Sequence, residues 1–387
     1  MNSEVISFFY DFNCIADKCR NNCCKAWNLI IDEETATKYR DMPGSEGKKL
    51  RSKMKKSGDG TYCLSAPFGK CCFQDKNGLC SMQCEGKGEL LPKVCRLFPR
   101  YTVSYGGCEI GVIDLACETA AQLFLKQEGR LRFIPSKEPL DIYWEVKEAD
   151  APFAETLKKD LERILDRLWK GTGKLWKAQR DILAHIYSEH LLLVRNEPIE
   201  PGKIPFDTGF LEERFAEEIP WIIKERYKEV YDDLPLIPVS FINEIIYAEF
   251  SDWYLITCHP GSYKLIRAYK KRFGKLYEKE ADEFFNDKLT CLFEKYTWLE
   301  DKLKSYFSYK LQMIYIGASI DYYLLEPVFM ALISEAFLMI FIVTAAESGD
   351  ELTLDRLSEL ISENDRLLWH NVSFRDRVMQ RVRDKLF

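Results

Sequence analysis

Residues 12–27 read FNCIADKCRNNCCKAW and carry four cysteines, at positions 14, 19, 23 and 24. Twelve of the chain's 14 cysteines fall in its first 117 residues; the other eight of this group are Cys63, Cys71, Cys72, Cys80, Cys84, Cys95, Cys108 and Cys117. A chain of 387 residues can bury a hydrophobic core without covalent staples, so a disulfide framework is not expected. In a reducing compartment, so dense a cysteine cluster is typical of metal binding.

The start of the chain, MNSEVISFFYDFN, lacks the basic segment, the apolar run and the small-residue cleavage site of a secretory signal. We therefore expect a cytoplasmic protein whose thiols stay reduced. The net charge of −6 argues against a general nucleic-acid binder, because such proteins usually carry a basic excess.

The distribution of residue types predicts two domains in a mainly α protein. Residues 1–130 hold nearly all the cysteines and many glycines, which is typical of a loop-rich module organised around metal. The Pro- and charge-rich segment 134–152 marks a boundary, and residues 131–387 are expected to form an irregular all-helical domain.

Apolar residues at spacings of three and four predict the helices of the second domain. The first covers 153–170, with Leu157, Leu161, Ile164, Leu165 and Leu168 on one face. Further helices are expected near 210–231, 240–257, 262–287, 299–317, 322–347 and 354–361, and a capping-box start at Ser373 and Asp376 predicts a last one.

The segment from Val328 to Ala346 approaches the length of a membrane span, which is about 20 residues. Glu335 interrupts it, and only Ala336–Ala346 is uninterrupted apolar sequence. We therefore expect a buried core helix and no membrane association.

The cysteine spacing leaves the metal open. Thiolates are soft ligands that suit zinc or an iron–sulfur cluster, and either site gathers ligands from several chain segments. Only Cys19/Cys23 and Cys80/Cys84 resemble zinc knuckles, so the irregular spacing favours iron–sulfur slightly over zinc. One site or two would be compatible with this number of thiols. Buried free cysteines are the plainer reading for Cys63, Cys258 and Cys291.

The sequence lacks most other functional motifs. No Gly-rich nucleotide-binding turn is present, and GTGK at 171–174 lacks the spacing of a phosphate loop. His185 and His190 are five residues apart and read as ordinary helix residues, and His370 reads as structural. The basic run 48–56 is expected to be a solvated face, with docking of an acidic partner as the alternative.

Five segments together resemble the flagellin lysine N-methylases, whose N-terminal region is similar to zinc- or iron-chelating cysteine-cluster proteins. They are FNC at 12–14, CCKAW at 23–27, the stretch from Cys71 to NGLC ending at Cys80, CRLFPR at 95–100, and Cys117. The resemblance carries over as metal ligands Cys14, Cys19, Cys23, Cys24, Cys71, Cys80, Cys95 and Cys117, and leaves Cys63, Cys72, Cys84 and Cys108 as extras.

The resemblance implies methyl transfer from S-adenosylmethionine to lysine side chains of flagellin, with a cysteine-bound iron–sulfur cluster, of the 4Fe–4S type, or zinc. The sequence departs from the family's pattern at Ala26, Cys72, Glu118, Thr119 and Gln122. Because no Gly-rich turn is present, the methyl donor is expected in a pocket between the cysteine module and the helical part. The alternatives are a non-catalytic metal-binding interaction protein and a redox protein.

Overall fold

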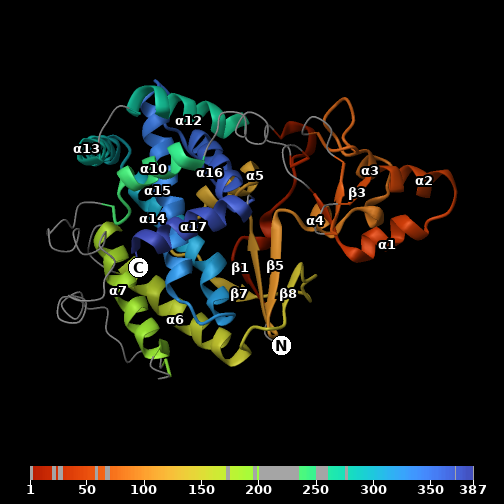
Figure 1. Ribbon diagram of the computed structural model, residues 1–387, viewed down its shortest axis with the longest axis horizontal. Coiled ribbons are helices and arrows are strands. Elements are labelled where there is room, and N and C mark those ends of the chain that lie inside the picture. The colour runs from red at the N-terminus through yellow and green to blue at the C-terminus, as the bar shows by residue number, and fades with distance from the viewer. Residues whose placement is uncertain are drawn as a thin grey trace.

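The computed structural model places a small lobe at one end of the molecule, a sheet in the middle and a helical body at the other end (Figure 1). The structure describes residues 3–19, 23–24, 29–56, 60–65, 70–170, 175–194, 198–199, 235–249, 260–274, 278–370 and 372–386.

The small lobe, defined here as residues 29–97, contains short elements around a three-stranded antiparallel sheet of order β2-β4-β3. Its elements are β2 (Ile30–Ile31), α1 (Glu33–Asp41), α2 (Gly44–Lys53), β3 (Met54–Lys56), β4 (Tyr62–Leu64), α3 (Ser81–Cys84), η4 (Gly88–Leu90) and α4 (Lys93–Leu97). It has its own cluster of buried apolar side chains, in which the Tyr39 hydroxyl donates to the Leu90 carbonyl at 2.6 Å. In the basic run, Lys48, Lys49, Lys55 and Lys56 are exposed, as expected of a solvated face.

A five-stranded sheet of order β7-β1-β6-β5-β8 joins the lobe to the helices. Its strands are β1 (Glu4–Ile6), β5 (Arg100–Tyr105), β6 (Cys108–Ile113), β7 (Phe133–Pro135) and β8 (Trp144–Val146), and the short turns η1 (Phe9–Asp11) and η2 (Ala16–Lys18) follow β1. The β5–β6 hairpin turns at Gly106 and Gly107, whose φ angles of 58° and 101° favour glycine. The periodicity did not predict this sheet, because β5 and β6 are buried along most of their length and show no clear alternation.

The helical body contains helices of up to 23 residues. Those described are α5 (Glu118–Leu125), α6 (Ala151–Lys170), α7 (Leu175–Val194), α10 (Val239–Glu249), α12 (Pro260–Phe273), α13 (Glu278–Lys295), α14 (Leu299–Ile314), η5 (Tyr315–Ser319), α15 (Leu325–Glu347), α16 (Leu354–Trp369) and α17 (Val372–Leu386). The fold is thus mainly α with a loop-rich N-terminal part, as the sequence predicts.

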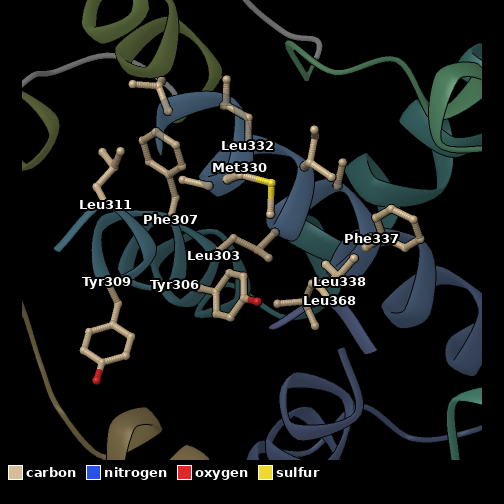
Figure 2. Close-up of a cluster of buried hydrophobic side chains, with 14 of the residues drawn as sticks. Leu303, Tyr306, Phe307, Tyr309, Leu311, Met330, Leu332, Phe337, Leu338 and Leu368 are labelled. Atoms are coloured by element: carbon tan, nitrogen blue, oxygen red, sulfur yellow. The ribbon is translucent and has the colours of Figure 1, made fainter. Parts of the chain in front are cut away.

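Helix α15 is the centre of this body and packs against α7, α10, α12, α13, α14, α16 and α17. Every residue from Pro327 to Ala345 is buried. Figure 2 shows Met330 of α15 pointing toward Leu303 of α14, and Leu338 of α15 beside Leu368 of α16. The helix is long and apolar enough to cross a membrane, but its apolar window is completely buried inside the protein. The prediction of a core helix at this position is therefore confirmed.

The other helix predictions agree with the structure with small changes. The pattern at 262–287 corresponds to two helices, α12 and α13, because the first ends at Phe273. The pattern at 299–317 is α14 followed by the 3-10 turn η5, and α10 is described only as far as Glu249. The predicted helix at 210–231 and GTGK at 171–174 lie outside the described residues.

The predicted domain boundary at residue 130 does not divide the hydrophobic core into two parts. Val5, Phe8 and Phe9, near the start of the chain, belong to the same buried cluster as the helices of the body. Strands β7 and β8 lie beyond residue 130 but complete the central sheet, so the described elements are all helical only from α6 onward. The boundary between two domains stays a prediction, and the packing instead distinguishes the small lobe from all the rest.

Candidate metal centre

Cysteines from four chain segments meet where the small lobe faces the helical body. Cys23 and Cys24 lie in a turn before β2, and Cys71 follows β4. Cys95 is in α4, and Cys117 precedes the first residue of α5. The Cys71 backbone N–H donates to the Cys24 carbonyl at 2.9 Å, which holds the first two segments together.

Four of the thiols form a hydrogen-bonded row in the order Cys23, Cys24, Cys71, Cys72. Hydrogen bonds from Cys24 and Cys72 lower the pKa of Cys71 to about 3, although burial opposes this. A hydrogen bond from Cys24 lowers the pKa of Cys23 to about 7, against burial and with help from the Arg366 guanidinium. Thiolates are therefore favoured at two positions of the row, and the thiolate is the form that binds metal.

Three further cysteines lie close enough to the row to respond to its charge. Burial, then the Cys71 and Cys23 sulfurs, raises the pKa of Cys95. Burial raises the pKa of Cys117 to about 12, with contributions from Cys19 and Cys23. Burial also raises the pKa of the Cys80 thiol. These thiols stay protonated by themselves, and a bound cation is what would deprotonate them.

The structure therefore brings six of the eight cysteines that the resemblance assigned as ligands near one another, and the charge of Cys19 acts on Cys117. Cys14 is the eighth; it is exposed, and its sulfur accepts a hydrogen bond from the Ala16 N–H at 3.4 Å. Cys72 was expected to be an extra, yet its thiol ends the row. Cys108 lies in β6 near Glu155 and Lys158, Cys291 is exposed on α13, and Cys258 lies outside the described residues.

The helical body reaches the cysteines through α16. Arg366 is buried, and its Nε donates to the Ala116 carbonyl at 2.9 Å, next to Cys117. Ser362, one turn earlier, donates to the same carbonyl at 2.8 Å. The guanidinium that favours the Cys23 thiolate is thus fixed by the backbone that presents Cys117.

An Asp–His pair lies beside this contact. His370 Nε2 is 2.8 Å from Asp114 Oδ2, and the Ala116 N–H donates to Asp114 Oδ1 at 2.9 Å. Burial acts to raise the pKa of Asp114, but His370 and the Ala116 N–H outweigh it and hold the pKa below its usual value. The His370 ring also packs edge-on against Phe98, with centroids 6.1 Å apart. The pair therefore connects the segments that carry Cys95 and Cys117.

The donor set fits a soft metal, because every predicted ligand is a sulfur and two of them favour the thiolate. The described sulfurs form a row instead of a compact group. Within the part of the chain that the structure describes, the three metal-ligating groups that lie within 4.8 Å of one another are Asp160, His185 and Glu189, in the helical body. Sequence reasoning missed this group because it paired His185 with His190; the signal was His185 and Glu189 at i and i+4, on one helix face.

A small cavity lies between the central sheet and α14, with Tyr101, Tyr105 and Gln312 in its lining. Its volume is about 10 Å³, close to the space of a single water molecule. This cavity is too small to receive S-adenosylmethionine, so the position of a donor pocket stays a prediction.

Comparison with known proteins supports the resemblance. The chain is similar to lysine-N-methylases. It is 27% identical over 117 residues to the lysine-N-methylases of Salmonella choleraesuis and Salmonella typhimurium, which covers 29% of this chain and 29% of each relative. It is 26% identical over 117 residues to the flagellar biosynthetic protein FliU of Salmonella muenchen, covering 69% of that protein. No family model matches the chain, and no solved structure does.

Proposed function

We propose that this protein is a cytoplasmic protein-lysine N-methyltransferase that transfers methyl groups from S-adenosylmethionine to flagellin. The observation that carries the proposal is the similarity to proteins named lysine-N-methylase. The name of a third relative, flagellar biosynthetic protein, supports a flagellar substrate. The proximity of six cysteines at the contact between lobe and body adds support, because the resemblance assigned those cysteines as ligands.

Methyl transfer to lysine makes two demands on the protein. The ammonium, whose free pKa is about 10.4, must lose a proton, and the amine must lie about 3–3.5 Å from the sulfonium methyl group. We propose His370 as the proton acceptor, with Asp114 as the residue that positions its ring. His370 is partly exposed, with 23% of its side chain accessible, so a substrate side chain can reach it.

The cysteine row would hold an iron–sulfur cluster, with zinc as the alternative metal. Ligands from four segments would be tied together by such a group, which would fix the small lobe against α5 and α16. Bound there, the group would supply thiolate–metal bonds that stabilise this arrangement. Arg366 and the Asp114–His370 pair would then be held at a constant distance from the substrate.

The first test measures metal and donor on the same sample. Full-length protein purified without oxygen is analysed for iron, sulfide and zinc, and then titrated with S-adenosylmethionine by calorimetry. We expect equal amounts of iron and sulfide and saturable donor binding, followed by transfer of labelled methyl groups to purified flagellin. Zinc alone without donor binding would overturn the enzyme proposal and favour a non-catalytic metal-binding interaction protein.

The second test concerns the proton acceptor. His370→Gln should lower the rate of methyl transfer roughly 10²- to 10⁴-fold at neutral pH while donor binding is retained. The loss should shrink as the pH approaches the lysine pKa, because the substrate then loses its proton without help. His190→Gln on α7 is the matched control, since His190 packs against Tyr323 away from the cysteines. A rate for His370→Gln equal to that of the control would remove His370 from the proposal.

A further inference from the structure

A second cluster of ligand-type side chains lies in the helical body, where α6 and α7 run side by side (Figure 1). Asp160 comes from α6, and His185 and Glu189 come from α7. One ligand atom from each lies within 4.8 Å of the others, and all three residues are buried. This cluster contains no cysteine and plays no part in the proposed methyl transfer.

The contacts within the cluster leave one group without a donor. His185 Nε2 is 3.1 Å from Asp160 Oδ1, and the Tyr315 hydroxyl donates to Asp160 Oδ2 at 3.1 Å. Glu189 is 0% exposed, and no neighbouring N–H or hydroxyl group of the described residues donates to its carboxylate oxygens, so Asp160 is its hydrogen-bond partner when one of the two carboxyl groups is protonated. A carboxylate oxygen of Glu189 is nevertheless 3.4 Å from His185 Nε2, so the unsatisfied group faces the other two ligands.

The charges around the cluster also favour a bound cation. Two buried carboxylates, Asp160 and Glu189, lie together, and the cation beside them is Arg163, whose Nη1 is 3.3 Å from Asp160 Oδ1. Arg163 is 29% exposed and lies three residues after Asp160 on α6. A buried carboxylate without a hydrogen bond is costly, and a divalent cation removes that cost by binding its oxygens.

We propose that Asp160, His185 and Glu189 form a binding site for a divalent first-row transition ion. One imidazole nitrogen with two carboxylates suits Mn²⁺, Fe²⁺ or Zn²⁺, whereas the cysteine row offers only sulfur. The Tyr315 hydroxyl donates to Asp160 and would fix the orientation of that carboxylate toward a bound ion. A bound ion would join α6, α7 and η5, the three elements that meet here.

The probe is Mn²⁺, a hard ion that oxygen and nitrogen ligands prefer over thiolates, so the cysteines interfere little. Tag-free, full-length protein treated with chelator is titrated with Mn²⁺, and the free ion is followed by electron paramagnetic resonance. We expect one saturable equivalent per chain. The electron spin echo of the bound ion should show coupling to the nitrogen of a single histidine, and this readout requires no variant.

Two matched variants assign the site. Glu189→Gln keeps the side-chain volume and should weaken Mn²⁺ binding at least tenfold. Glu335→Gln changes another fully buried acid, one that accepts a hydrogen bond from Gln179 on α7, and should leave Mn²⁺ binding unchanged.

Two results would overturn the proposal. One is a wild-type protein that binds no Mn²⁺, in which case the two carboxyl groups share a proton instead of a metal ion. The other is Mn²⁺ binding without histidine coupling and with equal affinity in both variants.

Discussion

The small lobe and the helical body are stabilised by different means. The lobe has ten residues in its buried apolar cluster, several short elements and six of the 14 cysteines. The body has a continuous core around α15, and it also buries ion pairs such as Lys310 with Asp365. A small core supplies little free energy of folding, so a region like the lobe usually depends on metal or cross-links. Three of the eight cysteines predicted to bind metal, Cys71, Cys80 and Cys95, lie in the lobe, where a bound metal would compensate for the small hydrophobic core.

Removal of metal should have the largest effect and should separate the two regions. We expect amide hydrogen exchange in residues 29–97 to become at least a hundredfold faster in chelated protein, while α15 keeps its protection, because apolar packing alone holds that helix. Hydrogen-exchange mass spectrometry measures both regions in one sample.

Cys71→Ser should reproduce this result without chelator, and Cys291→Ser, an exposed position on α13, is its control. Full protection of the lobe in the chelated protein would show that packing alone is sufficient there, and the contrast between the regions would be lost.

Breaking an ion pair should cost much more in the body than in the lobe. Lys310 is fully buried against Asp365, and its ammonium lies 4.9 Å from the centre of the Trp369 ring. Lys310→Met leaves Asp365 buried and unpaired, with an expected loss of about 3–5 kcal/mol in the free energy of unfolding. Lys38→Met in α1 removes an exposed pair with Glu34 at 2.7 Å and should cost less than about 1 kcal/mol. Urea unfolding of both variants checks the difference, and equal costs would contradict it.

The stability of the body should fall as pH rises through a window set by Glu335. Burial raises the pKa of Glu335 to about 8 from its usual 4.5, although Gln179 donates a hydrogen bond to it. Between these values the unfolded chain loses the proton and the folded chain keeps it. The free energy of unfolding should therefore decrease with pH, by at most about 1.4 kcal/mol per unit.

Glu335→Gln should remove this slope, so its advantage over the wild type should grow from pH 5 to pH 8 in thermal unfolding curves. Glu351→Gln, at an exposed position after α15, is the control and should follow the wild type. A constant difference between Glu335→Gln and wild type across this range would contradict the assigned pKa.

Substitutions of helix N-caps should give the smallest effects. They compare the same kind of hydrogen bond in the body and in the lobe. Thr353 caps α16 by accepting from the Arg356 N–H at 3.1 Å, and Thr353→Ala should cost about 1 kcal/mol. Asp32 caps α1 by accepting from the Thr35 N–H at 3.0 Å, and it also accepts from the Lys93 N–H at 2.7 Å. In metal-loaded protein, Asp32→Ala should lower the free energy of unfolding more than Thr353→Ala does, because it also removes the hydrogen bond that joins α1 to α4. The shift of the denaturant midpoint, at an unchanged slope of the unfolding free energy, measures both losses of stability. A smaller loss for Asp32→Ala would show that the hydrogen bond from the Lys93 N–H adds no stability.

The sequence by itself determined the features that lie within one element or one short segment. Helical spacing of leucines located α6 and α16, and the uninterrupted apolar run located the core helix α15. These signals are local, because side chains three and four residues apart share a helix face whatever the rest of the chain does.

The tertiary structure alone decided which segments meet. The central sheet pairs β1 with β6, about a hundred residues away, and both strands lose their alternation because both faces are covered. The same holds for the inclusion of Cys72 in the thiol row and for the meeting of Asp160 with His185 and Glu189. Contacts between distant segments depend on how whole helices and strands pack, and no periodicity within a single segment specifies that packing.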